Sequence, residues 1–522
     1  MSAHMDKSLH TDDLPARVDL LVIGGGINGV GVARDAVGRG LSVMLCEQGD
    51  LAEGTSSRTG KYIHGGLRYL EYYEFRLVRE ALIEREVLLR MAPQIIWPMR
   101  VVIPHNKSLR PAWMLRAGLF LYDHLGGRKL LPGTRAVNLR TDPVGASLKA
   151  ENTRGFEYSD CWVDDARLVV LTALSAVAKG AHVLTRTPFD SARRDNGEWV
   201  VQMTDKRNGR IITVRAKAII NCAGPWVERA LRGVSGVSTS KRVRLVKGSH
   251  IIVKKFWDGP QAYAIQNKDR RLIFVNPYMG DLALIGTTDT PYDGDAADVK
   301  ADAAEIRYIC DAVGSYFKHQ LAPADVIHSF SGVRPLFEDE ALNPSAVTRD
   351  YEFEVDGAVG DAVIVSAFGG KLTTHRKLAD HALERLIPHF PKMRGPWTSQ
   401  GHLPGGDIPD ADFEAFATKL GQQYSGLPQP LVRHHARLYG ARAKDVLRDA
   451  RTVADLGQHF GAQCHERELR FLIDHEWAET AEDLLWRRTK HFLRLSPTER
   501  AAVAQWLTMQ MLPRGMPAPQ AA

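Results

Sequence analysis

The 522-residue sequence predicts an α/β fold in which an antiparallel sheet interrupts a parallel-sheet domain and an all-helical domain follows. Three observations support this prediction. Residues 19–47 contain two apolar stretches separated by spaced glycines and a helical pattern. Short apolar stretches recur between residues 245 and 285 at a spacing typical of antiparallel strands. Residues 431–507 are rich in Ala, Leu, Arg and Glu at helical spacing.

The first element has the order of a βαβ unit that binds a dinucleotide. Gly24, Gly26 and Gly29 follow the first apolar stretch with the spacing G-x-G-x-x-G, which ends a buried parallel strand in a tight turn. Without side chains there, the backbone can approach a pyrophosphate. A helix that begins near Ile27 would turn its N–H groups and its positive dipole end toward that pyrophosphate. This arrangement is Rossmann-like.

An acidic residue completes the unit. Glu47 follows the second apolar stretch, residues 41–45, where a carboxylate can hydrogen-bond a ribose hydroxyl and disfavours a 2′-phosphate. The glycine spacing alone is a weak signal and also fits a flexible turn, but strand, helix, second strand and acid all agree with it. The unit therefore predicts nucleotide binding, without separating FAD from NAD.

The nucleotide-binding domain is expected in three pieces. Residues 180–200 and 211–221 alternate apolar and polar side chains around two Asn-Gly turns, which predicts an antiparallel hairpin or meander. Apolar stretches at 216–220 and 362–368 end in glycine-bearing turns that would return to the nucleotide. We therefore expect a disordered lead-in at 1–18, the nucleotide-binding domain at 19–80, 155–230 and 330–390, the substrate domain at 81–154 and 231–329, and the helical domain at 391–522.

Composition excludes several classes of protein. Hydrophobic residues at 44% and charged residues at 25% are ordinary for globular domains. The formal charge of +7 suits anionic substrates or an anionic membrane surface, but no basic run with interleaved aromatic residues indicates nucleic-acid binding. Five scattered cysteines without C-x-x-C spacing argue against disulfides and zinc, so we predict no metal ligands and expect a cytoplasmic protein.

One segment combines apolar and basic residues in a way that suits a membrane surface. The longest apolar stretch, residues 168–178, is far below the roughly 20 residues that span a bilayer. Residues 107–131, however, combine Trp113 and Phe120 with Arg110 and Arg116. Such a segment could lie on a membrane, and the alternative is an ordinary surface helix that packs its apolar face on the core.

A series of ordered motifs carries a resemblance to a known family. They are IHGGLRYLE at 63–71, YSDCWVDDARL at 158–168, NCAGPWV at 221–227, KGSHI at 247–251, IGTTD at 285–289, SGVRPL at 331–336, TRDY at 348–351, FGGKLTT at 368–374 and DHEW at 474–477. Together with the first unit they span nearly the whole chain, which resembles the FAD-dependent glycerol-3-phosphate dehydrogenases of the bacterial aerobic, respiratory type. The chain departs from the family pattern at Thr59-Gly60, where a serine pair is more usual.

The resemblance implies a glutathione-reductase-like or amino-acid-oxidase-like fold and non-covalent FAD. It implies oxidation of sn-glycerol 3-phosphate to dihydroxyacetone phosphate, with electrons passed to a membrane quinone such as ubiquinone. The enzyme would then lie peripherally on the cytoplasmic face of the inner membrane, against its inner leaflet, and a homodimer is compatible with this. Three alternatives stay open: a glycerol-3-phosphate oxidase that makes hydrogen peroxide, an amine or amino-acid oxidase, and a non-catalytic FAD-bound scaffold or sensor.

The resemblance also implies the reacting groups. Oxidising a secondary alcohol needs a group that accepts the hydroxyl proton and a flavin that accepts hydride. His250 is the expected base, and a hydrogen-bonded core histidine is the alternative. Arg334 is expected over the flavin, where it would stabilise developing negative charge. The substrate is expected to bind Arg68, Tyr69, Arg334, Arg349 and Lys371. The alternative for any single arginine is a surface ion pair, which their shared place in ordered motifs disfavours.

Cofactor contacts are expected from several glycine-bearing loops. The helix after Gly370 would direct its N-terminus at the flavin edge that becomes negative on reduction. His64 and Tyr69 are explained as well by loop packing as by a flavin pocket. The residues expected to contact FAD are Gly24, Gly26, Ile27, Asn28, Gly29, Glu47, Thr55, Ser56, Ser57, Lys61, His64, Gly65, Gly66, Ala223, Gly224, Trp226, Gly369, Gly370, Lys371, Leu372 and Thr373.

Overall fold

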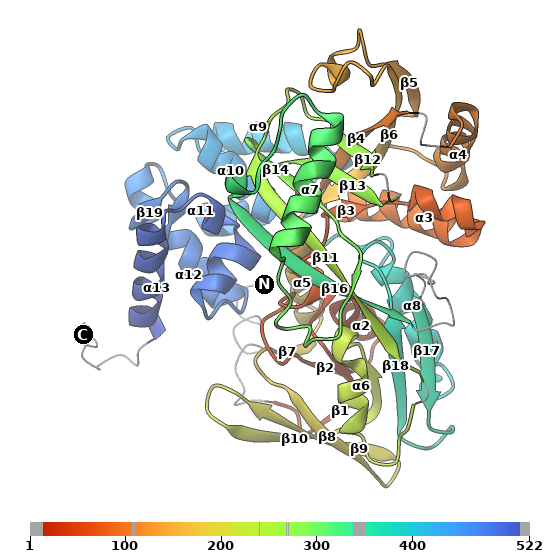
Figure 1. Ribbon diagram of the computed structural model, residues 1–522. Coiled ribbons are helices and arrows are strands. Elements are labelled where there is room, and N and C mark those ends of the chain that lie inside the picture. The colour runs from red at the N-terminus through yellow and green to blue at the C-terminus, as the bar shows by residue number, and fades with distance from the viewer. Residues whose placement is uncertain are drawn as a thin grey trace.

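The computed structural model describes residues 14–106, 110–239, 241–267, 269, 271–337 and 351–511. The chain builds two large sheets, and its C-terminal helices gather on one side of them (Figure 1). Residues 1–13 of the expected lead-in lie outside the described residues. The expectation that residues up to 18 are disordered is wrong for Arg17 and Val18. Both belong to strand β1 and pair with residues of β10.

The first sheet holds the predicted βαβ unit. Its strands run in the order β17-β18-β10-β1-β2-β7, and β9 and β8 continue from β10. Because β1 lies between β2 and β10 and is parallel to both, the carboxyl ends of three strands meet at one edge. The strands are β1 (Arg17–Ile23), β2 (Val43–Cys46), β7 (His182–Leu184), β8 (Phe189–Asp195), β9 (Glu198–Asp205), β10 (Arg210–Asn221), β17 (Tyr351–Asp356) and β18 (Val363–Gly369).

Alternate side chains of β1 pack into two different hydrophobic cores, one on each face of the sheet. Leu20 and Val22 point into the core that the sheet shares with helices α2 (Ile27–Gly38), α5 (Asp165–Val177) and α8 (His375–Glu384). Leu21 and Ile23 point to the opposite face, which β8, β9 and the short helix α6 (Val227–Arg232) cover. A strand buried on both faces is typical of a parallel sheet between two layers.

The predicted meander after β7 is confirmed. β8, β9 and β10 pair antiparallel, and the two Asn-Gly turns connect them. Asn196, Gly197 and Gly209 have left-handed backbone angles, with φ of 51°, 75° and 74°. Asparagine and glycine tolerate that conformation, which is why they favour such turns. The last residues of β10 then pair in parallel with β1, so the meander returns the chain to the glycine turn.

The second sheet is mixed, with strand order β15-β11-β14-β13-β12-β4-β6-β3, β16 beside β11 and β5 beside β6. The predicted antiparallel strands between residues 245 and 285 are confirmed in β11, β13 and β14. Helix α7 (Ala303–Tyr316) packs on this sheet. The strands are β3 (Tyr62–Ile63), β4 (Ile96–His105), β5 (Arg135–Asn138), β6 (Arg154–Val163), β11 (Val243–Lys254), β12 (Ala262–Gln266), β13 (Leu272–Tyr278), β14 (Leu282–Gly286), β15 (Thr290–Pro291) and β16 (His328–Phe337).

The pieces expected for the nucleotide-binding domain contribute strands to both sheets. β3 and nearly all of β6 and β16 fall within those pieces but pair in the second sheet, because the chain crosses between the sheets at these points. The domain boundaries therefore stay a prediction. The pairing does establish that β16 lies beside β11. Arg334 is on β16 and His250 is on β11.

The C-terminal region folds around a core of its own, as its helical pattern predicts. A two-stranded ladder of β19 (His459–Gly461) and β20 (Cys464–His465) accompanies the helices. The region is joined to the first sheet by a buried ion pair between Arg167 on α5 and Glu476. Its helices are α9 (Phe413–Gln423), α10 (Gln429–Tyr439), α11 (Ala443–Leu447), α12 (Glu466–His475), the π-helix η11 (Asp483–Arg488), the short η12 (His491–Leu493) and α13 (Pro497–Met511).

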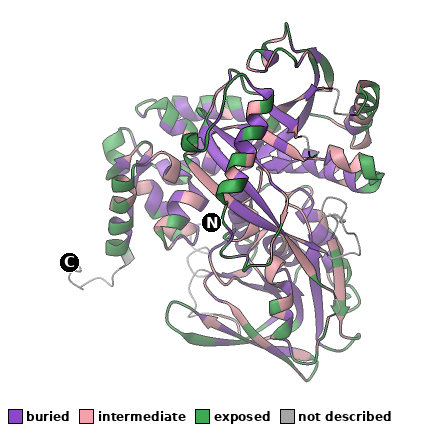
Figure 2. Cartoon of the chain, in the orientation of Figure 1, coloured by how far each residue is buried: buried purple, intermediate pink, exposed green. Residues whose placement is uncertain are grey.

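Two helices that contact each other pack against the second sheet. They are α3 (Phe75–Met91), which is largely buried, and α4 (Ala112–Leu125), most of whose residues are intermediate or exposed (Figure 2). Within α4 only Leu119 and Tyr122 are buried. Among the described residues, no helix has both the length and the apolar character needed to cross a bilayer.

Candidate active site

A cavity of about 840 Å³ lies where β1, β2, β10 and β18 end. Its lining comes from the glycine turn after β1, the loop after β2, the turn after β10 and the FGGKLTT segment after β18. Of the residues expected to contact the cofactor, those that line the cavity are Gly24, Gly26, Ile27, Asn28, Glu47, Thr55, Ser56, Ala223, Gly224, Trp226, Gly369, Gly370, Lys371 and Leu372.

The glycine turn permits close approach of α2 to the strand ends. Gly24 has φ of +108°, and a Cβ there would lie 2.6 Å from the carbonyl oxygen of Cys222 on the neighbouring chain segment. A Cβ on Gly29 would lie 1.9 Å from the carbonyl oxygen of Gly24. Gly29 does not itself line the cavity, so its contribution is to bring helix and strand together. The N-terminus of α2 then opens on the cavity, and there the amide of Ile27 donates to Oγ of Ser56 at 3.0 Å.

The acid at the end of β2 is held in place by backbone amides. Glu47 accepts hydrogen bonds from the N–H groups of Gly25 at 2.6 Å and Gly49 at 2.8 Å. Burial raises the pKa of Glu47 to about 6, against the effect of those two bonds. A ribose hydroxyl would be a further donor to this carboxylate, which is the role that the sequence predicts for Glu47.

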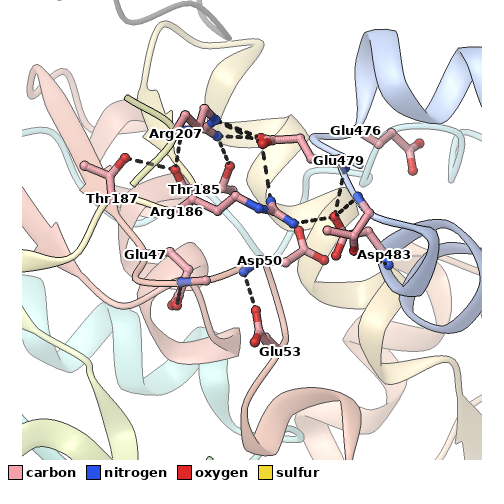
Figure 3. Close-up of polar contacts among 12 residues, drawn as sticks. Glu47, Asp50, Glu53, Thr185, Arg186, Thr187, Arg207, Glu476, Glu479 and Asp483 are labelled. Carbon is pink, nitrogen blue, oxygen red and sulfur yellow. Dashed lines mark hydrogen bonds and ion pairs between the residues drawn. The ribbon is translucent and has the colours of Figure 1, made fainter. Parts of the chain in front are cut away.

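The loop that follows Glu47 is clamped by the C-terminal region. Fully buried Asp50 is ion-paired with Arg487 at 2.6 Å and with Arg488 at 2.8 Å, both on η11. Figure 3 shows two further ion pairs between the C-terminal region and the rest of the chain. Asp483 is paired with Arg186 at 2.5 Å, and Glu479 with Arg207 at 2.5 Å. The amide of Thr187 donates to the carbonyl of Glu47 at 2.7 Å. The C-terminal region therefore fixes the loop that presents Glu47.

The opposite end of the cavity is bounded by Asn28 and the FGGKLTT segment. The Asn28 side chain donates to the carbonyl of Gly369 at 3.2 Å. A Cβ on Gly370 would lie 2.7 Å from Nδ2 of Asn28. Lys371 Nζ lies 4.0 Å from the centre of the Tyr69 ring. Helix α8 begins at His375, after a turn from 371 to 374, so its N-terminus lies slightly later than the sequence predicts.

His250 and Arg334 lie on adjacent strands beside this end of the cavity. His250 is buried and stacks on Phe330 with ring centres 5.0 Å apart. Burial, and then the charges of Arg334 and Lys61, lower the pKa of His250 to about 3, so the imidazole is neutral. Its Nδ1 atom has no hydrogen-bond partner within the described part of the chain. Arg334 is half-buried and ion-paired with Asp289.

Neither of these two side chains lines the cavity directly. Pro335, the residue after Arg334, does so, as do Arg58 and Thr59. A Cβ on Gly60, the next residue, would lie 3.5 Å from Nε2 of His250. The imidazole therefore faces the loop that separates it from the cavity.

The remaining predicted residues lie outside the cavity lining. The Lys61 side chain is directed into the protein and not into the cavity. Its Nζ atom lies 2.7 Å from the Asp165 carboxylate and 2.7 Å from the carbonyl oxygen of Ser57. The amide of His64 donates to Thr373 at 3.3 Å and so joins two of the family motifs. Gly65 and Gly66 pack against Leu82 and Tyr69, and Arg68 is half-buried on the short helix η4 (Leu67–Tyr72). Arg349 lies outside the described residues.

Sequence reasoning missed several cationic residues of the lining. Lys206, Arg229 and Arg232 all line the cavity, and Lys206 also donates to the carbonyl of Gln48 at 2.8 Å. They come from the meander turn and from α6, where no local motif marks them. Only the folded structure shows that these three residues line the same cavity. Their positive charge suits a pyrophosphate.

Comparisons with known proteins agree with this geometry. Residues 19–376 match the family described as FAD dependent oxidoreductase, and residues 397–509 match the C-terminal domain of alpha-glycerophosphate oxidase. The chain is 50% identical to the aerobic glycerol-3-phosphate dehydrogenase of Escherichia coli (strain K12), over 94% of this chain and 97% of that protein. The chain belongs to the family of FAD-dependent glycerol-3-phosphate dehydrogenases.

Two further relatives bear on fold and substrate. A glycerol-3-phosphate dehydrogenase from Bacillus halodurans, solved in complex with FAD, has a TM-score of 0.76 and 27% identity, covering 97% of this chain and 92% of that one. The D-erythritol 1-phosphate dehydrogenase of Brucella abortus (strain 2308) is 60% identical, over 94% of this chain and 98% of that protein. The predicted fold class and the predicted cofactor, FAD, are confirmed.

We expect Asp50→Asn to weaken FAD binding. Loss of the carboxylate leaves two buried guanidinium groups without their shared partner, at a cost of about 3–5 kcal/mol in stability. Because the same loop presents Glu47, we expect the Kd for FAD to rise at least tenfold, equivalent to about 1.4 kcal/mol. Titration of apoprotein with FAD measures this.

The matched control is Asp449→Asn, which removes a 91% exposed carboxylate that pairs with Arg467 in the same region. It is expected to leave both FAD affinity and unfolding temperature unchanged. Wild-type FAD affinity in a destabilised Asp50→Asn protein would contradict the coupling between the C-terminal region and the cofactor loop.

Proposed function

We propose that the protein oxidises the secondary alcohol of a phosphorylated polyol, in the first place sn-glycerol 3-phosphate to dihydroxyacetone phosphate, and passes the electrons to a membrane quinone. The observation that carries this proposal is the placement of buried, neutral His250 and half-buried Arg334 on paired strands beside the nucleotide cavity. FAD supplies the hydride acceptor when it is bound. The relatives named glycerol-3-phosphate dehydrogenase support the choice of substrate.

The residues of this chain have distinct roles in the proposal. His250 accepts the hydroxyl proton, which its neutral imidazole can do because one ring nitrogen carries no proton. Arg334 stabilises the developing alkoxide, and Asp289 orients its guanidinium. Arg68 and Lys371, from the two motifs that His64 and Thr373 join, bind the phosphate together with Arg349 and Tyr69.

The same residues allow a proposal for cofactor contacts. The turn at Gly24 and Gly26 and the N-terminus of α2 hold the pyrophosphate, and Glu47 binds the adenosine ribose. Asn28, Gly370 and Leu372 lie toward the flavin. Among the other expected contacts, Ser57, Lys61, Gly65 and Gly66 act by shaping the loops, since their side chains or backbone pack within the protein.

A four-carbon substrate is the second candidate. The specific observation in its favour is the 60% identity, over nearly the full length of both chains, to a protein named D-erythritol 1-phosphate dehydrogenase. Erythritol 1-phosphate presents the same secondary alcohol next to a phosphorylated carbon, with one more hydroxylated carbon beyond it. The phosphate-binding and proton-accepting residues proposed here serve either substrate.

An anaerobic absorbance experiment tests the function. We expect either sn-glycerol 3-phosphate or D-erythritol 1-phosphate to bleach the oxidised-flavin band and a quinone analogue to restore it. Free glycerol and erythritol should not bleach it, because the arginines then have no phosphate to bind. In Arg334→Ala the yellow band should persist while the bleaching rate falls by about 100- to 1000-fold.

Other outcomes assign a different function. Failure of both phosphate esters to bleach a yellow protein would exclude the proposed substrates. Fast reoxidation by oxygen with stoichiometric peroxide, and none by quinone, would make the protein an oxidase. Wild-type bleaching in Arg334→Ala would remove Arg334 from the site.

We propose α4 and η4 as the surface that lies on the cytoplasmic face of the inner membrane. The sequence leaves open whether the apolar face of residues 107–131 packs on the core. In α4 most of it does not, because Trp113 is 69% exposed and Phe120 is 62% exposed. Tyr73, which directly follows η4, is 80% exposed. Arg110 joins the two elements by an ion pair with Glu71 at 3.0 Å. Exposed aromatic side chains beside arginines suit an interfacial position on anionic lipid.

Replacing Trp113 and Phe120 together by serine is expected to weaken vesicle binding strongly. Each large apolar side chain contributes roughly 1.5–3 kcal/mol when buried, so the double variant should bind at least about 100-fold more weakly. Flotation with vesicles of anionic phospholipid measures it, and turnover with a soluble dye should be unchanged. The control is Ile211→Ser, since Ile211 is 64% exposed on β10. Equal binding by wild type and double variant would exclude this surface.

A further inference from the structure

Two histidines and one glutamate converge inside the C-terminal region, away from the nucleotide cavity. His434 lies on α10, Glu468 on α12 and His491 at the start of η12. One ligand atom from each lies within 4.8 Å of the others. Nε2 of His434 is 3.0 Å from one oxygen of Glu468, and Nε2 of His491 is 2.8 Å from the other. None of these residues has a part in the proposed oxidation.

A third imidazole points at the same carboxylate. Nδ1 of His435 lies 3.7 Å from Glu468 Oε1, and the residue is only 1% exposed. This nitrogen has no hydrogen-bond partner in the part of the chain that the structure describes. A buried polar atom without a partner is costly, and it is explained if the atom binds something between His435 and Glu468.

The charge of the cluster also favours a cation. The Glu468 carboxylate is buried, with only 1% of the residue exposed. Within the described ranges, its ion-pair partners are the histidines alone, with no lysine or arginine. A buried carboxylate without a cationic side chain beside it is costly, and a bound cation would remove that cost.

We propose that His434, Glu468 and His491 bind a divalent transition-metal ion of the zinc class, with His435 as the fourth ligand. Two imidazoles and a carboxylate form a ligand set that zinc prefers. A tetrahedral ion with bonds of about 2.0–2.2 Å separates its ligand atoms by roughly 3.3–3.6 Å. His434 and His491 therefore move out by about half an ångström, and His435 moves in slightly.

The position of the cluster gives the ion a structural role. It joins α10, α12 and η12, and His491 follows closely after η11, which carries Arg487 and Arg488 to Asp50. An ion here fixes the end of the segment that clamps the cofactor loop. The sequence predicted no metal because its cysteines lack zinc spacing, but these ligands come from three distant segments, and no local spacing marks them.

A hydrogen-bonded polar core is the competing explanation. Tyr439 donates to Glu468 at 2.9 Å, and His434 and His491 can donate through their Nε2 atoms. In that arrangement both Nε2 atoms carry protons and no ion binds. The two explanations differ in metal content, so they are separable by direct measurement.

The test is the metal content of the FAD-loaded protein after incubation with Zn²⁺ and gel filtration. We expect one zinc per chain, an unfolding temperature that falls on chelation and recovers with Zn²⁺, and visible bands of tetrahedral cobalt after loading with Co²⁺. Glu468→Gln, which keeps the shape, should weaken zinc binding by at least about 100-fold, because even substitutions around metal ligands cost about 10–100-fold. His402→Gln, at an exposed position, should retain the metal.

The metal content of the wild-type protein tests the proposal even if a variant does not fold. Less than one-tenth of an ion per chain with zinc, cobalt, nickel and manganese, together with an unfolding temperature insensitive to chelator, would overturn the proposal. Equal zinc retention by wild type and Glu468→Gln would also overturn it, because the ion would then bind elsewhere.

Discussion

The close approach of α2 to the ends of β1 and β10 is the constraint on which the cofactor site depends. Gly29 leaves room for the carbonyl of Gly24, and Gly24 in turn lies against the carbonyl of Cys222. These contacts are between backbone atoms, which cannot turn aside as a flexible side chain would. They place the N-terminus of α2 at the edge where three parallel strands end, and the cavity opens there.

The C-terminal region extends this constraint to Glu47, the acid that we propose binds the ribose. Asp50 with Arg487 and Arg488, and Glu476 with Arg167, are buried ion pairs between distant parts of the chain. Such pairs add little net stability, because desolvation offsets their attraction, but removing one partner is costly. We infer that they specify where the helical region docks. The loop after β2, and Glu47 with it, is positioned by that docking.

What the sequence predicts well is local. The glycine spacing, the acid after the second strand and the Asn-Gly turns each depend on neighbours within a few dozen residues, and the structure has them as expected. What it misses depends on distant partners. Lys61 resembles a cofactor ligand in its motif, but its charge is taken by Asp165, and Lys206 lines the cavity although no motif marks it. The histidine cluster around Glu468 escapes prediction for the same reason.

The FAD content of Gly29→Ala tests the central claim, that backbone contact at this turn creates the cofactor site. A Cβ there would lie 1.9 Å from a backbone oxygen, whereas a Cβ on Gly118 meets nothing within 4 Å. Overpacking of about 1–3 kcal/mol should weaken FAD binding by roughly 5- to 150-fold in Gly29→Ala, and Gly118→Ala should bind FAD like the wild type. Wild-type FAD affinity in Gly29→Ala would contradict the account.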